Sequence, residues 1–384
     1  MRAAFFAFIA VALLATGCSR TKAEDVKVWA WLGTGAAQSD SLLEHYFCKA
    51  AEAGIDAIFY EAHGGYPQII DSSSFTDVAA IENLKRAAVF AKKYGVELHA
   101  WMWTTNRCET TLREAHPEWY QVNAKGESLA DIKMYGREHY RFLCPNHEGV
   151  IEYMKERVRE IAAVDGLAGI HMDFIRYPDA MLPYALHESR HVVQDKFYPD
   201  WDCCYCDECR AAFKAQTGID PLDLEDPTSC QEWMQFRFDS MARYASEIAA
   251  EIKACGKISS AAVFASPAES RKLVRQDWTH FENVDYFMPM IYNDSYGFPD
   301  SWIETATREG IEELKAAGNP AVLRSGLSMG GRHMSEQVDS LKACAAYALA
   351  GGSPGITIFC LDSFNRAENG WAVLREIVDS VKNR

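Results

Sequence analysis

Apolar residues recur along this chain with a two-residue period over short stretches and with a helical period over longer ones. The two-residue period predicts eight strands, at 26–32, 56–62, 97–103, 167–175, 258–265, 286–292, 321–327 and 355–361. The helical period predicts helices at 39–53, 81–94, 148–164, 230–254, 302–317, 335–350 and 371–381, and only weakly at 277–282. Strands alternating with helices in this number predict an α/β fold, the (β/α)8 or TIM barrel. A doubly wound open sheet is the alternative, and it is disfavoured because no glycine-rich phosphate loop follows the first strand.

The amino-terminal residues have the form of an export signal. Met1-Arg2 precede an apolar run from 3 to 15, which is short for a membrane span. The segment Leu14-Ala15-Thr16-Gly17-Cys18 resembles the lipobox of bacterial lipoproteins, in which the cysteine is lipidated. An ordinary secretory signal with a chance cysteine is the alternative.

This pattern predicts the organisation of the whole chain. We expect a signal at 1–18, a tether at 19–25 and a barrel domain at 26–384 with an insertion at about 178–230. The protein is then expected in the bacterial cell envelope, touching the outer membrane only through the lipid on Cys18.

Composition narrows the class of partner. Asp and Glu number 54 against 39 Lys and Arg, a net charge of −15, which argues against nucleic acid or an anionic membrane surface. Aromatic residues make up 12% of the chain and include ten Trp, which suits a cleft that binds carbohydrate.

Candidate chemistry lies where the predicted strands end, because barrel enzymes place their sites at the carboxyl ends of the strands. The stretch Gly169–Pro178 places His171 and Asp173 on one face and Ile170, Met172 and Phe174 on the other. Alternation in the other strands predicts three catalytic carboxylates, Asp173, Glu61 and Asp362, with Asp294 as a further candidate. The residues expected to bind substrate are Trp31, His63, Trp101, Trp103, His171, Arg176, Tyr292 and Asn293. In the alternative interpretation the tryptophans fill the barrel core and the carboxylates pair with His63, His171 or Arg324.

Several segments together resemble a known family. They are His116-Pro117-Glu118-Trp119, Phe142–Asn146, Gly169–Pro178 and Asp285–Tyr292. In order and spacing they resemble the bacterial glycosyl-hydrolase-like family ten proteins, over about residues 26–300. The resemblance implies a TIM barrel acting on glycosidic bonds, with Asp173 as the leading catalytic carboxylate and Tyr292 near the sugar. Related chains often carry Arg where this one has His63, so the family's general acid is not transferred. Glycosidases with glutamates on strands four and seven do not fit, because 324–328 holds no carboxylate.

A cysteine cluster lies in the predicted insertion. Cys204, Cys206 and Cys209 pack three thiols into six residues beside Cys203, a spacing typical of zinc ligands. Followed by Arg210 and Phe213, the cluster is similar to one in family forty-two β-galactosidases, which implies a structural zinc whose fourth ligand comes from an earlier loop. Cys108 is the analogous donor, with Cys144, Cys230 and Cys203 as alternatives, and disulfides or free thiols as other interpretations. A site with four sulfur ligands is closed, so this zinc would be structural, and no cofactor is expected in catalysis.

Three functions are compatible with these features. The favoured one is a lipoprotein glycoside hydrolase that cleaves O-glycosidic bonds of an oligo- or polysaccharide with paired carboxylates. The second is a glycan-binding lipoprotein without catalysis on the same barrel. The third, a metal-dependent amidase or deacetylase using His63, His99 and His171, is disfavoured because His99 lies deep in its strand.

Overall fold

The computed structural model describes residues 26–64, 75–328 and 338–383. The predicted signal, the tether and the lipidation site Cys18 lie outside the described residues. Among helices in the described parts of the chain, none is long and apolar enough to cross a membrane.

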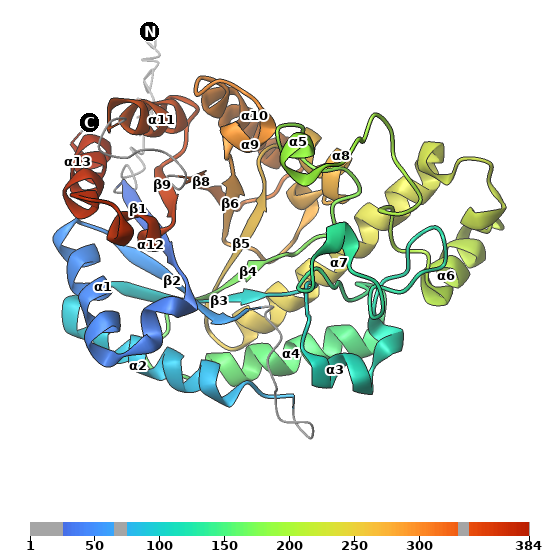
Figure 1. Ribbon diagram of the computed structural model, residues 1–384, viewed down its shortest axis with the longest axis horizontal. Helices are drawn as coiled ribbons and strands as arrows, with labels where there is room; N and C mark the ends of the chain where they lie inside the picture. The colour runs from blue at the N-terminus through green and yellow to red at the C-terminus, as the bar shows by residue number, and fades with distance from the viewer. Residues whose placement is uncertain (1–25, 65–74, 329–337, 384) are drawn as a thin grey trace, which may run out of the picture.

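A closed parallel barrel forms the centre of the molecule (Figure 1). Its strands are β1 (Lys27–Leu32), β2 (Ala57–His63), β3 (Glu97–Trp103), β4 (Gly169–Asp173), β5 (Ile258–Phe264), β6 (Tyr286–Met290), β7 (Val322–Leu323), β8 (Ser325–Ser328) and β9 (Gly355–Phe359). The sheet runs β5-β4-β3-β2-β1-β9-β8-β6-β7 and closes because β5 also pairs with β6. Both β7 and β8 pair with β6, so they fill one position and the barrel has eight. The predicted (β/α)8 fold is confirmed.

Helices surround this barrel. The longer ones are α1 (Asp40–Glu52), α2 (Val78–Tyr94), α4 (Glu148–Ala162), α7 (Gln231–Ala254), α10 (Trp302–Ala316), α11 (Val338–Ala350) and α13 (Gly370–Lys382). The shorter ones are α3 (Thr110–Ala115), α5 (Leu186–Arg190), α6 (Asp207–Thr217), α8 (Pro267–Val274), α9 (Asn293–Tyr296) and α12 (Leu361–Arg366). Local signals set their ends: the Ser39 hydroxyl accepts the Leu42 N–H at 3.1 Å, and Gly95 closes α2 with a φ of 68°.

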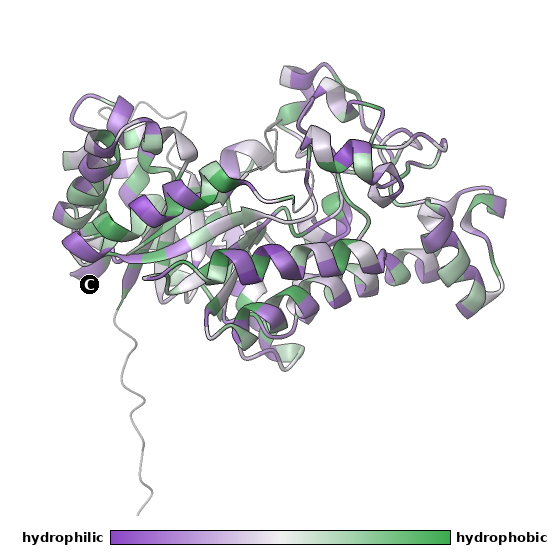
Figure 2. Ribbon diagram, turned by 90° about the horizontal axis from the view of Figure 1, so that it is seen from below, coloured by the Kyte–Doolittle hydropathy of each residue, from purple (hydrophilic) through white to green (hydrophobic). Residues whose placement is uncertain are grey.

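Strand alternation divides the core in two. Trp29, Trp31, Phe59, Trp101, Trp103 and Met288 pack inside the barrel. Their neighbours in sequence, among them Ala30, Ile58 and Met102, pack between the barrel and its helices. Helices with one apolar and one polar face complete this outer layer, as the mixed colours of Figure 2 show.

Three details differ from the sequence-based expectations. Glu61 pairs with Trp101 but His63 pairs with Met102, so a bulge turns His63 to the outer face of the barrel. The last strand stops at Phe359, which places Asp362 in α12 and not at the strand end. The helix expected at 277–282 is only a 3₁₀ turn at Trp278–His280, and α8 precedes it.

The segment after β4 carries the cysteine cluster and projects sideways from the barrel with α6 (Figure 1). Its base is fixed by a buried carboxylate: Asp202 Oδ1 accepts hydrogen bonds from Arg237 at 2.8 Å and from Arg275 at 3.0 Å. Since all three side chains are buried, this network ties the insertion to α7 and to the end of α8.

Candidate active site

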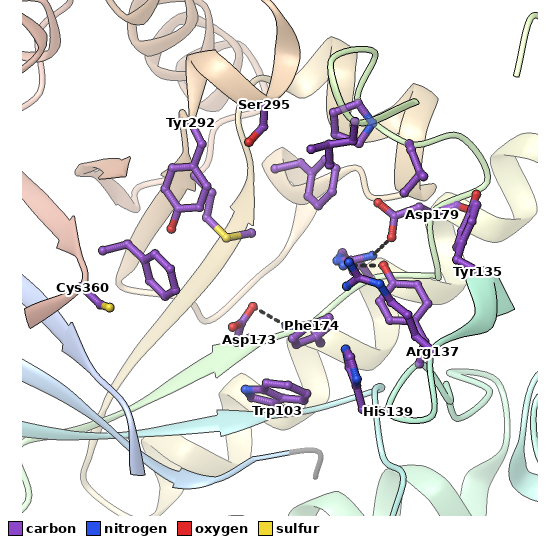
Figure 3. Close-up of a pocket in the computed structure, with 18 of the residues that line it drawn as sticks. Trp103, Tyr135, Arg137, His139, Asp173, Phe174, Asp179, Tyr292, Ser295 and Cys360 are labelled. Carbon is purple, nitrogen blue, oxygen red and sulfur yellow. Dashed lines mark hydrogen bonds and ion pairs between the residues drawn. The ribbon is translucent and has the colours of Figure 1, made fainter. Parts of the chain in front are cut away.

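A cavity of about 530 Å³ opens at the carboxyl ends of the strands (Figure 3). The three predicted carboxylates, Glu61, Asp173 and Asp362, all line it. Residues from the ends of β2, β3, β4, β5, β6 and β9 contribute to its wall. The mouth of the barrel therefore gathers acids from three separate parts of the sequence.

Asp173 is held at the end of β4. Its Oδ2 accepts the Trp101 indole N–H at 3.0 Å, and its Oδ1 accepts the Phe174 backbone N–H at 2.6 Å. Phe174 has a φ of 50°, a left-handed conformation that is costly for a bulky residue, and this turn aims its N–H at the carboxylate. Such strain, held by the surrounding structure, is typical of functional sites.

Glu61 and Asp362 share one backbone turn after β1. The Gly33 N–H donates to Asp362 Oδ2 at 3.1 Å, and the next N–H, of Thr34, donates to Glu61 Oε2 at 3.2 Å. The Tyr46 hydroxyl donates to the other Asp362 oxygen at 3.3 Å. Gly64 lies against Glu61 on the other side, so closely that a Cβ there would be only 2.5 Å from Oε1. Glu61 is thus confined between two segments of backbone.

Burial changes the proton affinity of these acids. Burial above all, opposed by the Thr34 hydrogen bond and aided by the charges of Asp173 and Asp362, raises the pKa of Glu61 to about 7. Burial also raises the pKa of Asp173, opposed by the Phe174 N–H and the charge of Arg176. At neutral pH Glu61 therefore holds its proton for a substantial part of the time and can serve as an acid.

Aromatic side chains form the walls between the acids. Trp101 and Trp103 lie along β3, and Tyr292 stacks on Phe359 with ring centroids 5.7 Å apart. Burial, then the charge of Asp173, raises the pKa of Tyr292 well above its ordinary value, so its hydroxyl keeps its proton. Flat apolar surfaces with a few fixed polar groups suit the faces of sugar rings.

Four residues predicted to bind substrate lie away from the cavity lining. Trp31 and His171 fill the barrel core, where the Trp31 N–H donates to His171 Nε2 at 3.0 Å. His63, turned outward by the bulge, is buried and accepts from Arg107 at 2.7 Å. Asn293 donates to Asp300 and to the Phe298 carbonyl in its own loop. The structure therefore places these four side chains outside the cavity lining, where other residues of the chain engage each of them.

Arg176 lines the cavity as part of a buried ion pair. It lies 3.0 Å from Asp179 and also donates to the Tyr140 hydroxyl at 3.1 Å. Burial lowers the pKa of Arg176 to about 10, which leaves the guanidinium charged at neutral pH. Sequence reasoning missed the residues around it, among them Tyr135, Arg137, His139 and Arg190. They lie in long loops or in the five-residue helix α5, where no periodicity marked them.

The cysteine cluster has the geometry of a metal site. Sulfur atoms of Cys144, Cys204, Cys206 and Cys209 all lie within 4.8 Å of one another. Cys144 is 3.7 Å from Cys206 and 3.5 Å from Cys209, far beyond disulfide bonding and close to the spacing of about 3.8 Å that tetrahedral Zn–S bonds impose. Hydrogen bonds from the other three thiols lower the pKa of Cys206, which favours a thiolate. Cys144 completes the group, so the expectation of Cys108 as fourth ligand is wrong.

The described histidines do not form a second metal site. Within residues 26–64, 75–328 and 338–383, the four cysteines are the only set of three or more Cys, His, Asp or Glu that could hold a metal ion. His99 pairs with Glu97 at 2.8 Å, while His171 contacts Trp31 and Ser260. The three histidines of the amidase or deacetylase hypothesis therefore do not converge on a metal.

Several solved structures with a similar barrel are glycoside hydrolases. The catalytic domain of β-amylase from Paenibacillus polymyxa superposes with a TM-score of 0.64 at 12% identity, covering 93% of this chain and 99% of that one. The β-N-acetylhexosaminidase from Bacteroides fragilis gives 0.54 at 10% identity, over 92% of this chain and 65% of that one. An α-galactosidase of family thirty-six from Geobacillus stearothermophilus, in complex with raffinose, gives 0.51 at 11% identity, over 94% of this chain and 42% of that one. No family model and no curated protein matches the chain. At these identities the likeness shows the barrel fold alone, and membership of family ten stays a prediction.

Proposed function

We propose that this protein is a glycoside hydrolase that cleaves O-glycosidic bonds of an oligo- or polysaccharide by acid/base catalysis between carboxylates. One observation carries the proposal: Glu61, Asp173 and Asp362 face a single aromatic-walled cavity, and the pKa of Glu61 is about 7. Glycoside hydrolysis needs one protonated and one ionised carboxyl group on either side of the scissile bond. The glycoside hydrolase folds that resemble this barrel support the same class of reaction.

The environments of the acids suggest their roles. Glu61, buried and close to two other carboxylates, would donate its proton to the leaving oxygen. Asp173, held by the Trp101 and Phe174 N–H groups, would attack or stabilise the oxocarbenium-like centre. Asp362, fixed by Gly33 and Tyr46, would keep the pKa of Glu61 high and act as a positioning residue. The tryptophans of β3 would stack on the sugar.

The test is a screen of the full mature protein against a panel of oligosaccharides, followed by variants. Glu61→Gln and Asp173→Asn should each lower kcat/KM by roughly a hundredfold or more, since each removes a group that acts in the transition state. Asp239→Asn, an exposed carboxyl on α7, is the control and should leave the rate unchanged. Normal cleavage by Asp173→Asn would refute the mechanism, and binding without any cleavage would favour the glycan-binding alternative.

A structural zinc ion is part of the proposal. Cys144, Cys204, Cys206 and Cys209 would hold it, joining the loop before α4 to the start of α6. Four thiolate ligands leave no open position, so the ion would stabilise the insertion and take no part in catalysis. Metal analysis of freshly purified, reduced protein should give one zinc per chain, and Cys206→Ser should lower it. Protein that lacks zinc under these conditions would contradict the assignment.

Export and lipid anchoring complete the proposal. The lipobox-like segment ending at Cys18 would direct cleavage and acylation, so the barrel would be held at the bacterial cell envelope. Expressed in a bacterium, the full chain should fractionate with membranes and its amino-terminal peptide should carry acyl chains by mass spectrometry. Cys18→Ser should release the protein, and unchanged fractionation of this variant would refute the anchor.

A further inference from the structure

One wall of the active-site cavity carries two arginines that form no close ion pair. Arg137 and Arg190 line the cavity, and neither lies within ion-pair distance of an acidic residue that the structure describes. Arg176, in the same cavity, lies 3.0 Å from Asp179. Acidic residues outnumber basic ones by 54 to 39. A shortage of acidic side chains therefore does not explain why these two arginines form no close ion pair. Both guanidinium groups are therefore available to bind an anionic ligand in the cavity.

Arg137 is held in place by a rigid turn. Tyr135 and Gly136, just before it, have φ values of 53° and 67°, both left-handed. The Tyr135 hydroxyl donates to the Asp179 carbonyl at 2.7 Å, and its ring stacks on Trp201 with centroids 5.3 Å apart. This packing fixes the turn against the insertion, so the half-buried Arg137 is presented to the cavity at little further cost in entropy.

Arg137, in a turn, and the exposed Arg190, at the end of α5, both act on His139. Burial, then the charges of Arg137 and Arg190, lowers the pKa of His139. Figure 3 shows Arg137 and His139 on the side of the pocket opposite Tyr292 and Cys360. Repulsion between like charges opposes such a grouping, and a bound anion would relieve it.

The nearest acids are already engaged. Glu138, next to Arg137 in sequence, is bound by Lys133 and Arg141, and Asp179 is bound by Arg176. The charge of Arg137 also acts on Asp179, whose pKa it lowers against the effect of burial, so Asp179 balances part of the positive charge on the loop side. Carboxylates gather at the barrel mouth, and the guanidinium groups of Arg137 and Arg190 lie on the loop side outside any close ion pair.

We propose that Arg137 and Arg190 bind an anionic group of the glycan, a uronate carboxylate or a sulfate ester, on a sugar unit beside the one being cleaved. This inference rests on the proposed glycoside hydrolase function. Guanidinium groups match the paired oxygens of carboxylates and sulfates, and they bind them with charge-assisted hydrogen bonds. The anionic sugar would occupy the loop side because Asp173 and Asp362 would repel it at the barrel mouth.

The experiment measures binding by calorimetry, with Glu61→Gln as the background so that no probe is hydrolysed. The probes are galacturonate and chondroitin oligosaccharides, each compared with its carboxyl-reduced form, and a sulfated, carboxyl-reduced chondroitin. We expect at least one charged probe to bind more tightly than its neutral counterpart. Arg137→Ala with Arg190→Ala should weaken that binding roughly tenfold or more, the loss expected for charge-assisted hydrogen bonds. The carboxylate and sulfate arms show which anion is preferred.

Controls separate this inference from the function on which it rests. Arg375→Ala, an exposed arginine on α13, should change nothing, and Arg137→Lys should restore part of the affinity because it keeps the charge. Equal binding of charged and neutral probes, or no binding of either, overturns the anionic subsite even if neutral glycans are cleaved. Arginine-dependent binding with no hydrolysis of any glycan by the unmodified protein leaves the subsite standing and refutes the hydrolase.

Discussion

At the scale of single residues, the site depends on how closely the backbone approaches Glu61. The Thr34 N–H holds one carboxylate oxygen, and Gly64 lies against the other with no room for a Cβ. A carboxyl group with so little freedom keeps one orientation and one desolvated environment, and the environment raises its pKa. Gly64 therefore acts on the acid without contacting substrate.

Two glycine variants test whether the contact between Gly64 and Glu61 positions the acid. Gly64→Ala would place a Cβ 2.5 Å from Glu61 Oε1, so the carboxylate must move, and we expect kcat/KM to fall roughly tenfold or more. Gly33→Ala is the control, since its Cβ would lie 3.5 Å from Asp362 and 3.6 Å from Glu61, an ordinary contact. Steady-state kinetics on the substrate found by screening measures both. Equal losses in the two variants would show that the contact at Gly64 is not what positions the acid.

The raised pKa of Glu61 makes a prediction about stability. Unfolded, this side chain ionises near 4.5; folded, it keeps its proton until about 7. The folded state binds more protons in that window, so this group's contribution to stability is present below pH 4.5 and is lost as pH rises through 7. Glu61→Gln stays neutral, and at pH 8 it should be more stable than the unmodified protein by about 3 kcal/mol, with little difference at pH 4.5. Urea denaturation at both pH values measures it, and a difference independent of pH would contradict the assigned environment.

The same group sets the expected pH dependence of activity. A general acid must be protonated, so kcat/KM should fall as pH rises through about 7. Asp362→Asn removes one of the charges that raise the pKa of Glu61, and it should move this fall to lower pH. A pH–rate profile of the two proteins tests this. An alkaline limb at the same pH in both would show that Asp362 does not act on the acid.

Period-two reasoning could predict part of this site. It found Glu61, Asp173, Trp101 and Trp103 because strands of a parallel barrel must alternate inward and outward. It failed at His63 because a bulge adds one residue to β2, and no residue in 61–64 forces a bulge by itself. On the sequence alone, Cys108 was preferred to Cys144 as the fourth cysteine of the cluster for a similar reason. Which loop approaches α6 depends on tertiary packing, and the sequence pattern does not show it.

At the scale of elements, the sequence predicted best where periodicity was long and uninterrupted. The strand at 97–103 was predicted with the bounds of β3, and α4, α7 and α10 begin within one residue of their predicted starts. Errors lie where elements are short. Strand seven is broken at Arg324 into β7 and β8, and α8 was not expected at all, because eight residues hold too few turns for a clear helical period.

Elements of the insertion are joined to the barrel by the Asp202 network. Asp202→Ala would leave two buried guanidinium groups, on α7 and after α8, without their anion. Removing one partner from such a network costs about 3–5 kcal/mol, and we expect a corresponding fall in the free energy of unfolding. Asp200→Ala, two residues away, removes only an exposed partner of Lys125 and should have a small effect. Equal effects in urea denaturation would show that the buried network does not hold the insertion.

At the scale of the whole molecule, one insertion serves both candidate sites. Its cysteines lie near α6, while its Leu182, Leu186 and Arg190 line the loop side of the cavity. The inside of the barrel has a core to which residues 178–230 do not contribute, whereas the core outside the strands also includes Cys203, Tyr205 and Phe213 of the insertion. Metal loss should therefore disturb the insertion and the cavity's outer wall before it disturbs the inside of the barrel.

Cys144→Ser tests this separation of roles. The variant should lose bound zinc and become sensitive to limited proteolysis within 178–230, because its closed four-sulfur site is broken. Thermal unfolding of the barrel, followed by far-ultraviolet circular dichroism, should change little. Cys255→Ser, a half-buried cysteine at the end of α7, is the control and should retain zinc and protease resistance. If Cys144→Ser keeps its metal, the ligand assignment is wrong. If metal loss instead unfolds the whole molecule in a single transition, the insertion and the barrel unfold as one unit.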